Sequence, residues 1–142
     1  MECHPEISES STMPVTLYTD GGCTGNERLD ASQRVMSAVV SDANGTILAH
    51  LTKSGGSNNI AELWSIELAL RWAKESGHKA VVIKTDSQNN LAWVQGRIGR
   101  KMNDRSAVLD IWSRINLLRQ DVDLTLCWIP RENNVVGIVL EG

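Results

Sequence analysis

Three acidic residues stand where this sequence could bring carboxylates together. Asp20 closes the apolar, β-branched stretch Val15–Thr19, Asp86 follows the short apolar run Ala80–Lys84, and Glu62 lies near the start of a helix-patterned segment. If the two apolar runs form parallel neighbouring strands, Asp20 and Asp86 meet at one sheet edge, which is where open sheets flanked by helices bind ligands. Glu62 reaches that edge if its helix begins there.

Carboxylates gathered at one edge repel each other unless a cation neutralises them. Oxygen-only ligation suits a hard divalent ion such as Mg²⁺ or Mn²⁺ rather than zinc. Two such ions, roughly 3.5–4 Å apart, can hold the attacking water and the leaving oxygen of an in-line displacement at phosphorus. The acids therefore indicate metal-dependent phosphoryl chemistry.

Each acid, taken singly, also has a purely structural explanation. Asp20 can open the turn that Gly21 and Gly22 continue. The spacing from Asn59 to Glu62 approximates a capping box, and Asp86 is a competent N-cap. The coincidence of three acids in comparable places favours the metal site.

Apolar periodicity predicts the elements that would position these acids. The segment 59–76 is apolar on more than half of a helical circumference, Asn44-Gly45 predicts a hairpin, and 80–84 reads as a strand that follows the helix by a right-handed parallel crossover. The order βββαβααβ, with a C-terminal stub of about two helical turns, predicts an α/β fold with a mixed sheet and helices packed on it. The predicted strands are 15–20, 34–41, 46–53, 80–84 and 124–129, the predicted helices are 59–76, 87–94 and 104–120, and the stub is 133–142.

Composition narrows the class of protein. We expect residues 1–13 to be a disordered leader and residues 14–142 to be one domain, since 142 residues suffice for a buried core. The net charge of −3 gives no overall attraction for nucleic acid, so such binding would depend on bound cations or on a local basic patch such as the loop 96–103. The three cysteines are odd in number and have no paired spacing, which favours a reducing compartment. Without an apolar run long enough for a membrane, we expect a cytoplasmic monomer.

Four short segments resemble the type 1 ribonuclease H family in order and spacing. They are Thr19-Asp20-Gly21, Ser57-Asn58-Asn59-Ile60-Ala61-Glu62-Leu63, Thr85-Asp86-Ser87-Gln88 and Trp128-Ile129-Pro130-Arg131-Glu132-Asn133-Asn134. The resemblance implies a ribonuclease H-like mixed five-stranded sheet and endonucleolytic hydrolysis of the RNA strand of RNA/DNA hybrids. It further implies two Mg²⁺ or Mn²⁺ ions per site and products with 5′-phosphate and 3′-hydroxyl ends. A transposase-like nuclease or a sugar kinase relative fits the short length and the spacing from Asn58 to Glu62 less well.

The resemblance also assigns roles to individual residues. Asp20 would bridge both ions, and Glu62 and Asp86 would hold them against the scissile phosphate. Other residues would contact the hybrid, whose 2′-hydroxyls distinguish RNA from DNA, although a buried thiol at position 23 and a helix cap at 57 and 58 remain equally open. The expected substrate-binding residues are Gly21, Gly22, Cys23, Asn26, Ser57, Asn58, Asn59, Gln88 and Arg131.

The sequence departs from the family pattern at its end. Where relatives continue Arg-Glu-x-Asn-x-x-Ala-Asp, with a fourth carboxylate last, this chain has Ile138, which cannot ligate a metal. Glu141, one helical turn further, or the amide oxygen of Asn134 or Asn133 could substitute for that acid. The alternative to an efficient enzyme is therefore a hybrid-binding domain with weak or lost catalysis.

Overall fold

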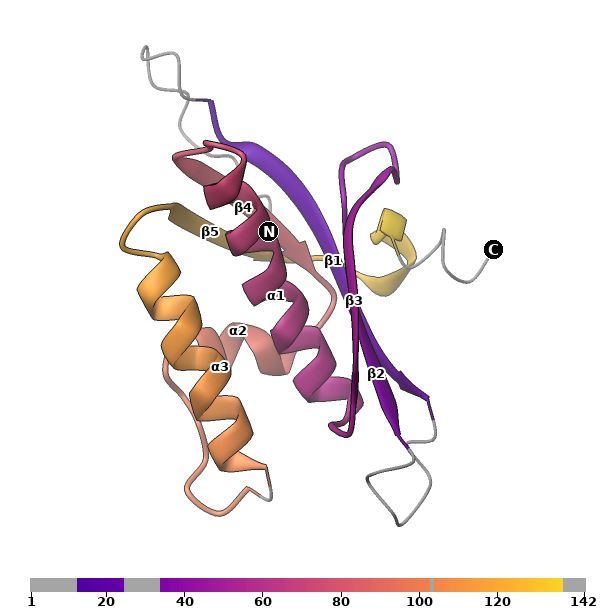
Figure 1. Ribbon diagram of the computed structural model, residues 1–142, viewed down its shortest axis with the longest axis vertical. Coiled ribbons are helices and arrows are strands. Elements are labelled where there is room, and N and C mark those ends of the chain that lie inside the picture. Colours follow the sequence, from indigo (N-terminus) through magenta and orange to yellow (C-terminus); the bar gives the residue numbers. More distant parts are fainter. Residues whose placement is uncertain (1–12, 25–33, 103, 137–142) are drawn as a thin grey trace.

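The computed structural model describes residues 13–24, 34–102 and 104–136 (Figure 1). Within these residues, five strands and three α-helices follow the predicted order. A 3₁₀ helix over Arg131–Asn133 comes after the last strand. In chain order the elements are β1 (Val15–Thr24), β2 (Val35–Ser41), β3 (Ile47–Ser54), α1 (Asn58–Glu75), β4 (Ala80–Thr85), α2 (Gln88–Val94), α3 (Arg105–Leu118) and β5 (Asp123–Trp128).

The strands form one mixed sheet in the order β3-β2-β1-β4-β5, with β1 in the centre. β1 pairs antiparallel with β2 and parallel with β4, and β4 pairs parallel with β5. α1 packs against β1 and β2, and α3 lies beside α1 (Figure 1). The predicted mixed five-stranded sheet with helices packed on it is confirmed.

Helix α1 supplies much of the core. Leu63, Ile66 and Leu70 recur at helical spacing and are completely buried. The helix begins after Ser57, whose Oγ accepts a hydrogen bond from the backbone N–H of Ile60 at 3.3 Å. The cap at Ser57 shows that the alternative of a capping box from Asn59 to Glu62 is wrong, so Glu62 is not needed to start its helix.

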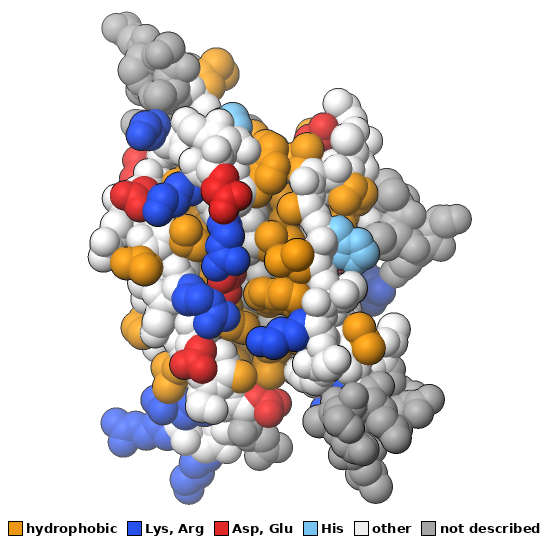
Figure 2. Space-filling model, viewed as in Figure 1, with side chains coloured by type: hydrophobic (Ala, Val, Ile, Leu, Met, Phe, Trp, Pro, Cys, Tyr) orange, Lys and Arg blue, Asp and Glu red, His pale blue; other side chains and the backbone are white. Residues whose placement is uncertain are grey.

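An ion-pair network joins α1 to α3. Glu67 is 1% exposed, and its carboxylate accepts hydrogen bonds from Arg71 and from the Nε of Arg114. Beside it, apolar and charged side chains together line a groove of about 300 Å³ between the helices and β3. Hydrophobic side chains are visible along the middle of the face in Figure 2. Because a buried carboxylate requires paired donors, this network fixes α3 against the helix that carries Glu62.

The structure corrects the predicted end of β1. The strand continues to Thr24 instead of ending at Asp20, because Tyr18 to Thr24 pair in register with Ser41 to Val35 of β2. Asp20 is therefore a residue within a strand, and the alternative that it opens a turn is wrong.

Several other expectations can be compared with the structure. The N-cap of α2 is Ser87, whose Oγ accepts from the N–H of Asn90, so the alternative that Asp86 caps this helix is wrong. Cys127 in β5 is buried and disulfide-bonded, so the expectation of reduced cysteines is wrong for that residue.

The leader up to residue 12, and the stub beyond residue 136, lie outside the described residues. Within the described parts of the chain, no helix has the length and apolarity needed to cross a bilayer.

Candidate metal centre

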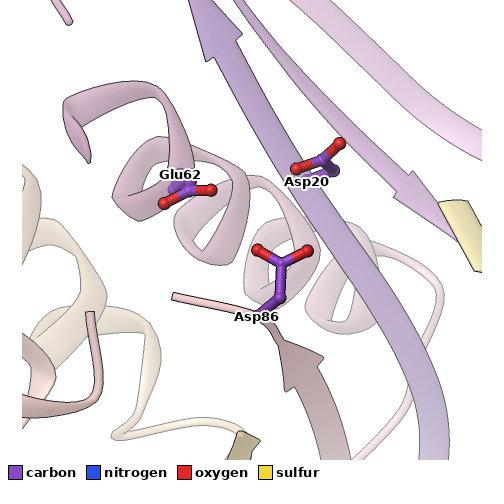
Figure 3. A group of neighbouring side chains, drawn as sticks. All are labelled: Asp20, Glu62 and Asp86. Atoms are coloured by element: carbon purple, nitrogen blue, oxygen red, sulfur yellow. The ribbon is translucent and has the colours of Figure 1, made fainter. Parts of the chain in front are cut away.

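The three predicted acids converge. Asp20 comes from β1, Glu62 from α1 and Asp86 from the residue that follows β4, and their side chains point toward one another (Figure 3). One carboxylate oxygen from each lies within 4.8 Å of those of the other two. All three residues are partly exposed, so a solvated ion can reach them.

Strand register explains the meeting of Asp20 and Asp86. The parallel ladder between β1 and β4 ends at the pair Tyr18 and Lys84, two residues before each acid. Beyond this pair β4 gives way to α2, whereas β1 continues alongside β2. The acids thus stand at the point where the two strands separate, which is the kind of crevice where open α/β sheets bind ligands.

Close packing of β1 on α1 places Glu62 beside the other two acids. A Cβ atom added to Gly21 would lie 2.2 Å from the backbone carbon of Ala61, a distance that real side chains do not tolerate. A second contact holds the same pair of elements, because the N–H of Cys23 donates to Asn58 Oδ1 at 2.8 Å. Glu62, the residue after Ala61, is therefore held against the strand that carries Asp20.

Two side chains from the C-terminal part of the chain, Trp128 and Asn134, hold the segment around Asp86. Asn134 is completely buried, and its Nδ2 donates to the backbone oxygen of Thr19 at 2.9 Å and to Asp86 Oδ2 at 3.0 Å. Trp128 Nε1 donates to the backbone oxygen of Asp86 at 3.1 Å. The prediction that Asn134 offers its amide oxygen as a substitute ligand does not fit this geometry, because the amide nitrogen faces the acid.

One of the three acids, Glu62, has a strongly raised pKa. Burial, followed by the charges of Asp86 and Asp20, raises the pKa of Glu62 from 4.5 to about 7, although a hydrogen bond with Ser87 opposes the shift. A carboxyl with such a pKa is poised between its protonated and ionised forms at neutral pH. A cation that displaces the proton would remove this repulsion.

The donor set fits a hard divalent cation. Three carboxylate oxygens within mutual reach are ligands that Mg²⁺ and Mn²⁺ take readily, and the set contains no thiolate or imidazole that would favour zinc. Asp20, Glu62 and Asp86 therefore form a candidate divalent-metal site.

Sequence comparison identifies the family. The RNase H family model matches residues 12–137, which is most of the chain. This chain belongs to the RNase H family. The matched range ends one residue before Ile138, the residue that the family resemblance aligns with a fourth acid. No curated protein matches the sequence.

Solved structures of RNase H1 proteins share the fold. RNase H1 from the halophilic archaeon Halobacterium salinarum superposes with a TM-score of 0.67 at 23% identity, over 90% of this chain and 94% of the other. The N-terminal RNase H domain of Rv2228c from Mycobacterium tuberculosis gives 0.67 at 24% identity, over 90% and 95% of the two chains. LC11-RNase H1, in its complex with an RNA/DNA hybrid, gives 0.61 at 23% identity, over 84% and 88%.

Several residues that the family resemblance assigns to the substrate line one cleft with the acids. The cleft has a volume of about 400 Å³. Around the acids it is lined by Gly21, Gly22, Asn58, Asn59 and Arg131. These residues are therefore placed where a ligand bound at the candidate metal site would contact them.

The remaining assigned residues are placed differently. Ser57 uses its hydroxyl oxygen to cap α1, and the half-buried Cys23 uses its backbone N–H on Asn58. Gln88 is exposed at the first position of α2. Asn26 and Glu141 lie outside the described residues.

Sequence reasoning missed two features of this candidate site. One is the steric role of Gly21, whose only signal was a glycine directly after the first acid. The other is the role of Asn134 as a hydrogen-bond donor. The family spacing indicated this residue, but a sequence does not show which end of its amide faces Asp86. Both depend on contacts between segments that are far apart in the sequence.

Proposed function

We propose that this protein hydrolyses the RNA strand of RNA/DNA hybrids endonucleolytically, with Mg²⁺ or Mn²⁺ as its cofactor, and leaves 5′-phosphate and 3′-hydroxyl ends. The observation that carries the proposal is the convergence of Asp20, Glu62 and Asp86 within 4.8 Å in a chain of the RNase H family. The family resemblance suggests two ions per site.

The residues of the chain have distinct tasks in this proposal. Asp20, Glu62 and Asp86 would together hold the ions, and the family resemblance assigns Asp20 a part in binding both. When bound, the ions supply charge stabilisation at the phosphate and a water of lowered pKa that attacks in line. The packing of Gly21 on Ala61 keeps the ligands in place before substrate arrives, so that little reorganisation is needed during the reaction.

The structure offers surfaces that suit a hybrid. Asn58, Asn59 and Arg131 line the cleft beside the acids and carry amide and guanidinium donors for phosphate and 2′-hydroxyl oxygens. Lys and Arg side chains also gather at the end of the molecule where the loop between α2 and α3 lies (Figure 2). Arg97, Arg100 and Lys101 of this loop are exposed, which would offset the overall negative charge. The complex of LC11-RNase H1 with a hybrid supports the same substrate class.

A second candidate function is hybrid binding with weak or lost cleavage. Ile138 favours it, because a carboxylate is missing from the position where the family resemblance places the fourth ligand. In this case the three acids would still hold a cation that could contact a phosphate, but the water would be poorly activated. Ile138→Asp is then expected to increase the rate of cleavage.

A cleavage assay tests the proposal. A hybrid labelled on its RNA strand is incubated with the protein and either Mg²⁺ or Mn²⁺, and the wild type is compared with Asp20→Asn. We expect the variant to lose roughly a thousandfold or more in rate, because the metal supplies several kcal/mol and each 1.36 kcal/mol is a factor of ten. Asp110→Asn, which removes an exposed carboxylate from α3, is the matched control and should cleave like the wild type.

Three outcomes separate the candidates. Cleavage that disappears in Asp20→Asn supports the enzyme. Hybrid binding without cleavage, with activity gained in Ile138→Asp, supports the binding domain. Cleavage that persists unchanged in Asp20→Asn, or a wild type that neither binds nor cleaves the hybrid, contradicts both.

A further inference from the structure

We propose that Asn134 is a positioning residue that holds Asp86 in the orientation needed for metal binding. This inference rests on the proposed metal centre and deepens it. Its basis is one buried amide group that contacts both acid-bearing strands. The Nδ2 atom donates to Thr19, the residue before Asp20, and to the carboxylate of Asp86.

The chemistry of its neighbours fixes the direction of this amide. A backbone carbonyl and a carboxylate both accept hydrogen bonds, so only the NH₂ end of Asn134 can face them. Turned over, the amide would place its own oxygen against two other oxygens. The arrangement therefore makes Asn134 a donor to Asp86 and leaves Asp86 Oδ1 outside this bond, available for a cation.

The position of Asn134 matters because the sheet no longer holds the two strands together there. The last paired residues of β1 and β4 are Tyr18 and Lys84, so Asp20 and Asp86 lie beyond the ladder. The two hydrogen bonds of Asn134 span this separation, from the backbone of β1 to the side chain that follows β4. These hydrogen bonds connect Asp86 to β1, as backbone pairing connects the residues before it to that strand.

The site retains this amide at a cost. Asn134 is 0% exposed, and its Oδ1 is a buried acceptor without a hydrogen-bond partner among the described residues. A buried polar atom without a hydrogen-bond partner destabilises the folded state. A leucine, whose side chain branches at the same atom, would have no such polar atom, so burial alone does not explain an asparagine here.

Partners behind a metal ligand orient it and tune its affinity for the metal, and their loss typically weakens binding about 10–100-fold. We therefore expect Asn134→Leu to weaken Mn²⁺ binding about tenfold or more, measured by isothermal titration calorimetry on the full chain without substrate. Asn90→Leu is the matched control. Asn90 is also completely buried, and its amide atoms have no hydrogen-bond partner among the described residues. The Asn90→Leu variant should bind Mn²⁺ like the wild type.

A double-mutant cycle separates positioning from a general structural role. If Asn134 acts through Asp86, adding Asn134→Leu to Asp86→Ala should weaken Mn²⁺ binding no further. An equal loss in both backgrounds would overturn the proposal, as would an Asn134→Leu variant that binds Mn²⁺ like the wild type. Thermal unfolding of each variant shows whether the loss comes from unfolding, and a tenfold weaker affinity in a protein with an unchanged Tm supports positioning.

The result is independent of whether the proposed function holds. A wild type that cleaves hybrids while Asn134→Leu keeps full Mn²⁺ affinity removes only the positioning role. A wild type that does not cleave, but whose Mn²⁺ affinity depends on Asn134 through Asp86, removes only the nuclease. A wild type that binds no Mn²⁺ overturns the metal centre and the positioning role together.

Discussion

The two acids that lie beside Asp20 in the site, Glu62 and Asp86, are held in different ways. On the side of α1, Gly21 lies directly on the backbone of Ala61, so Glu62 is placed by contact between two main chains. On the side of β4, the pairing between β1 and β4 has ended, and the side chain of Asp86 is held by a hydrogen bond from Asn134. The first arrangement is steric and has no room to adjust, whereas the second is directional and depends on one amide group. The same metal centre should therefore respond differently to changes on its two sides.

The largest effect is expected from adding a methyl group on the α1 side. Gly21→Ala would force β1 and α1 apart, because the added Cβ overlaps backbone atoms that cannot rotate away. Overpacking of this kind typically costs about 1–3 kcal/mol and sometimes more. We expect a lower free energy of unfolding and weaker Mn²⁺ binding, measured by denaturant titration and calorimetry.

The adjacent glycine provides the control for this change. A Cβ on Gly22 would meet nothing within 4 Å, so Gly22→Ala should leave stability and Mn²⁺ affinity close to those of the wild type. Equal losses in the two variants would show that the approach of β1 to Ala61 is not what places Glu62.

An intermediate effect is expected from the charge of Glu62. Its pKa is raised from 4.5 to about 7 in the folded protein. A carboxyl whose pKa is raised by folding stabilises the protein below its unfolded value, and this contribution is lost as the pH rises through the folded pKa. Without metal, the free energy of unfolding should therefore fall between about pH 4.5 and pH 7, and Mn²⁺ affinity should rise over the same range because the ion displaces a proton.

Glu62→Gln isolates this contribution, since the amide does not titrate. Denaturant titrations with a chelator present, from pH 5 to pH 8, should show a shallower fall in the variant than in the wild type. If the two proteins have the same pH dependence, Glu62 is not the group that titrates.

The smallest effect is expected from the hydrogen bond on the α1 side. Asn58→Ala removes the acceptor of the Cys23 N–H, and a hydrogen bond of this kind contributes about 1 kcal/mol. Because the packing of Gly21 on Ala61 remains and holds Glu62 without this second contact, Mn²⁺ affinity should change little, unlike that of Asn134→Leu. Similar losses of Mn²⁺ affinity in Asn58→Ala and Asn134→Leu would remove the contrast between the two sides.

The fold and the three acids could be predicted because they depend on local patterns. Alternating and helical apolar periodicity marked the elements, and parallel pairing of the strands before Asp20 and Asp86 was enough to bring these acids to one edge. The continuation of β1 to Thr24 was missed, because glycines read as a turn unless the pairing with β2 is known.

The features that escaped prediction are contacts between distant segments. The overlap that Gly21 avoids is with a residue 40 positions later, and the amide direction of Asn134 depends on Thr19 and Asp86. The disulfide at Cys127 was missed because spacing alone does not show which cysteines approach each other.

The most direct test of the metal centre is a crystal structure of the protein soaked in Mn²⁺, with anomalous scattering used to locate the ion. We expect an anomalous peak in contact with carboxylate oxygens of Asp20, Glu62 and Asp86, and no such peak in Asp20→Asn crystals treated in the same way. A wild-type structure without a peak among the three acids, even after soaking in excess Mn²⁺, would contradict the metal centre.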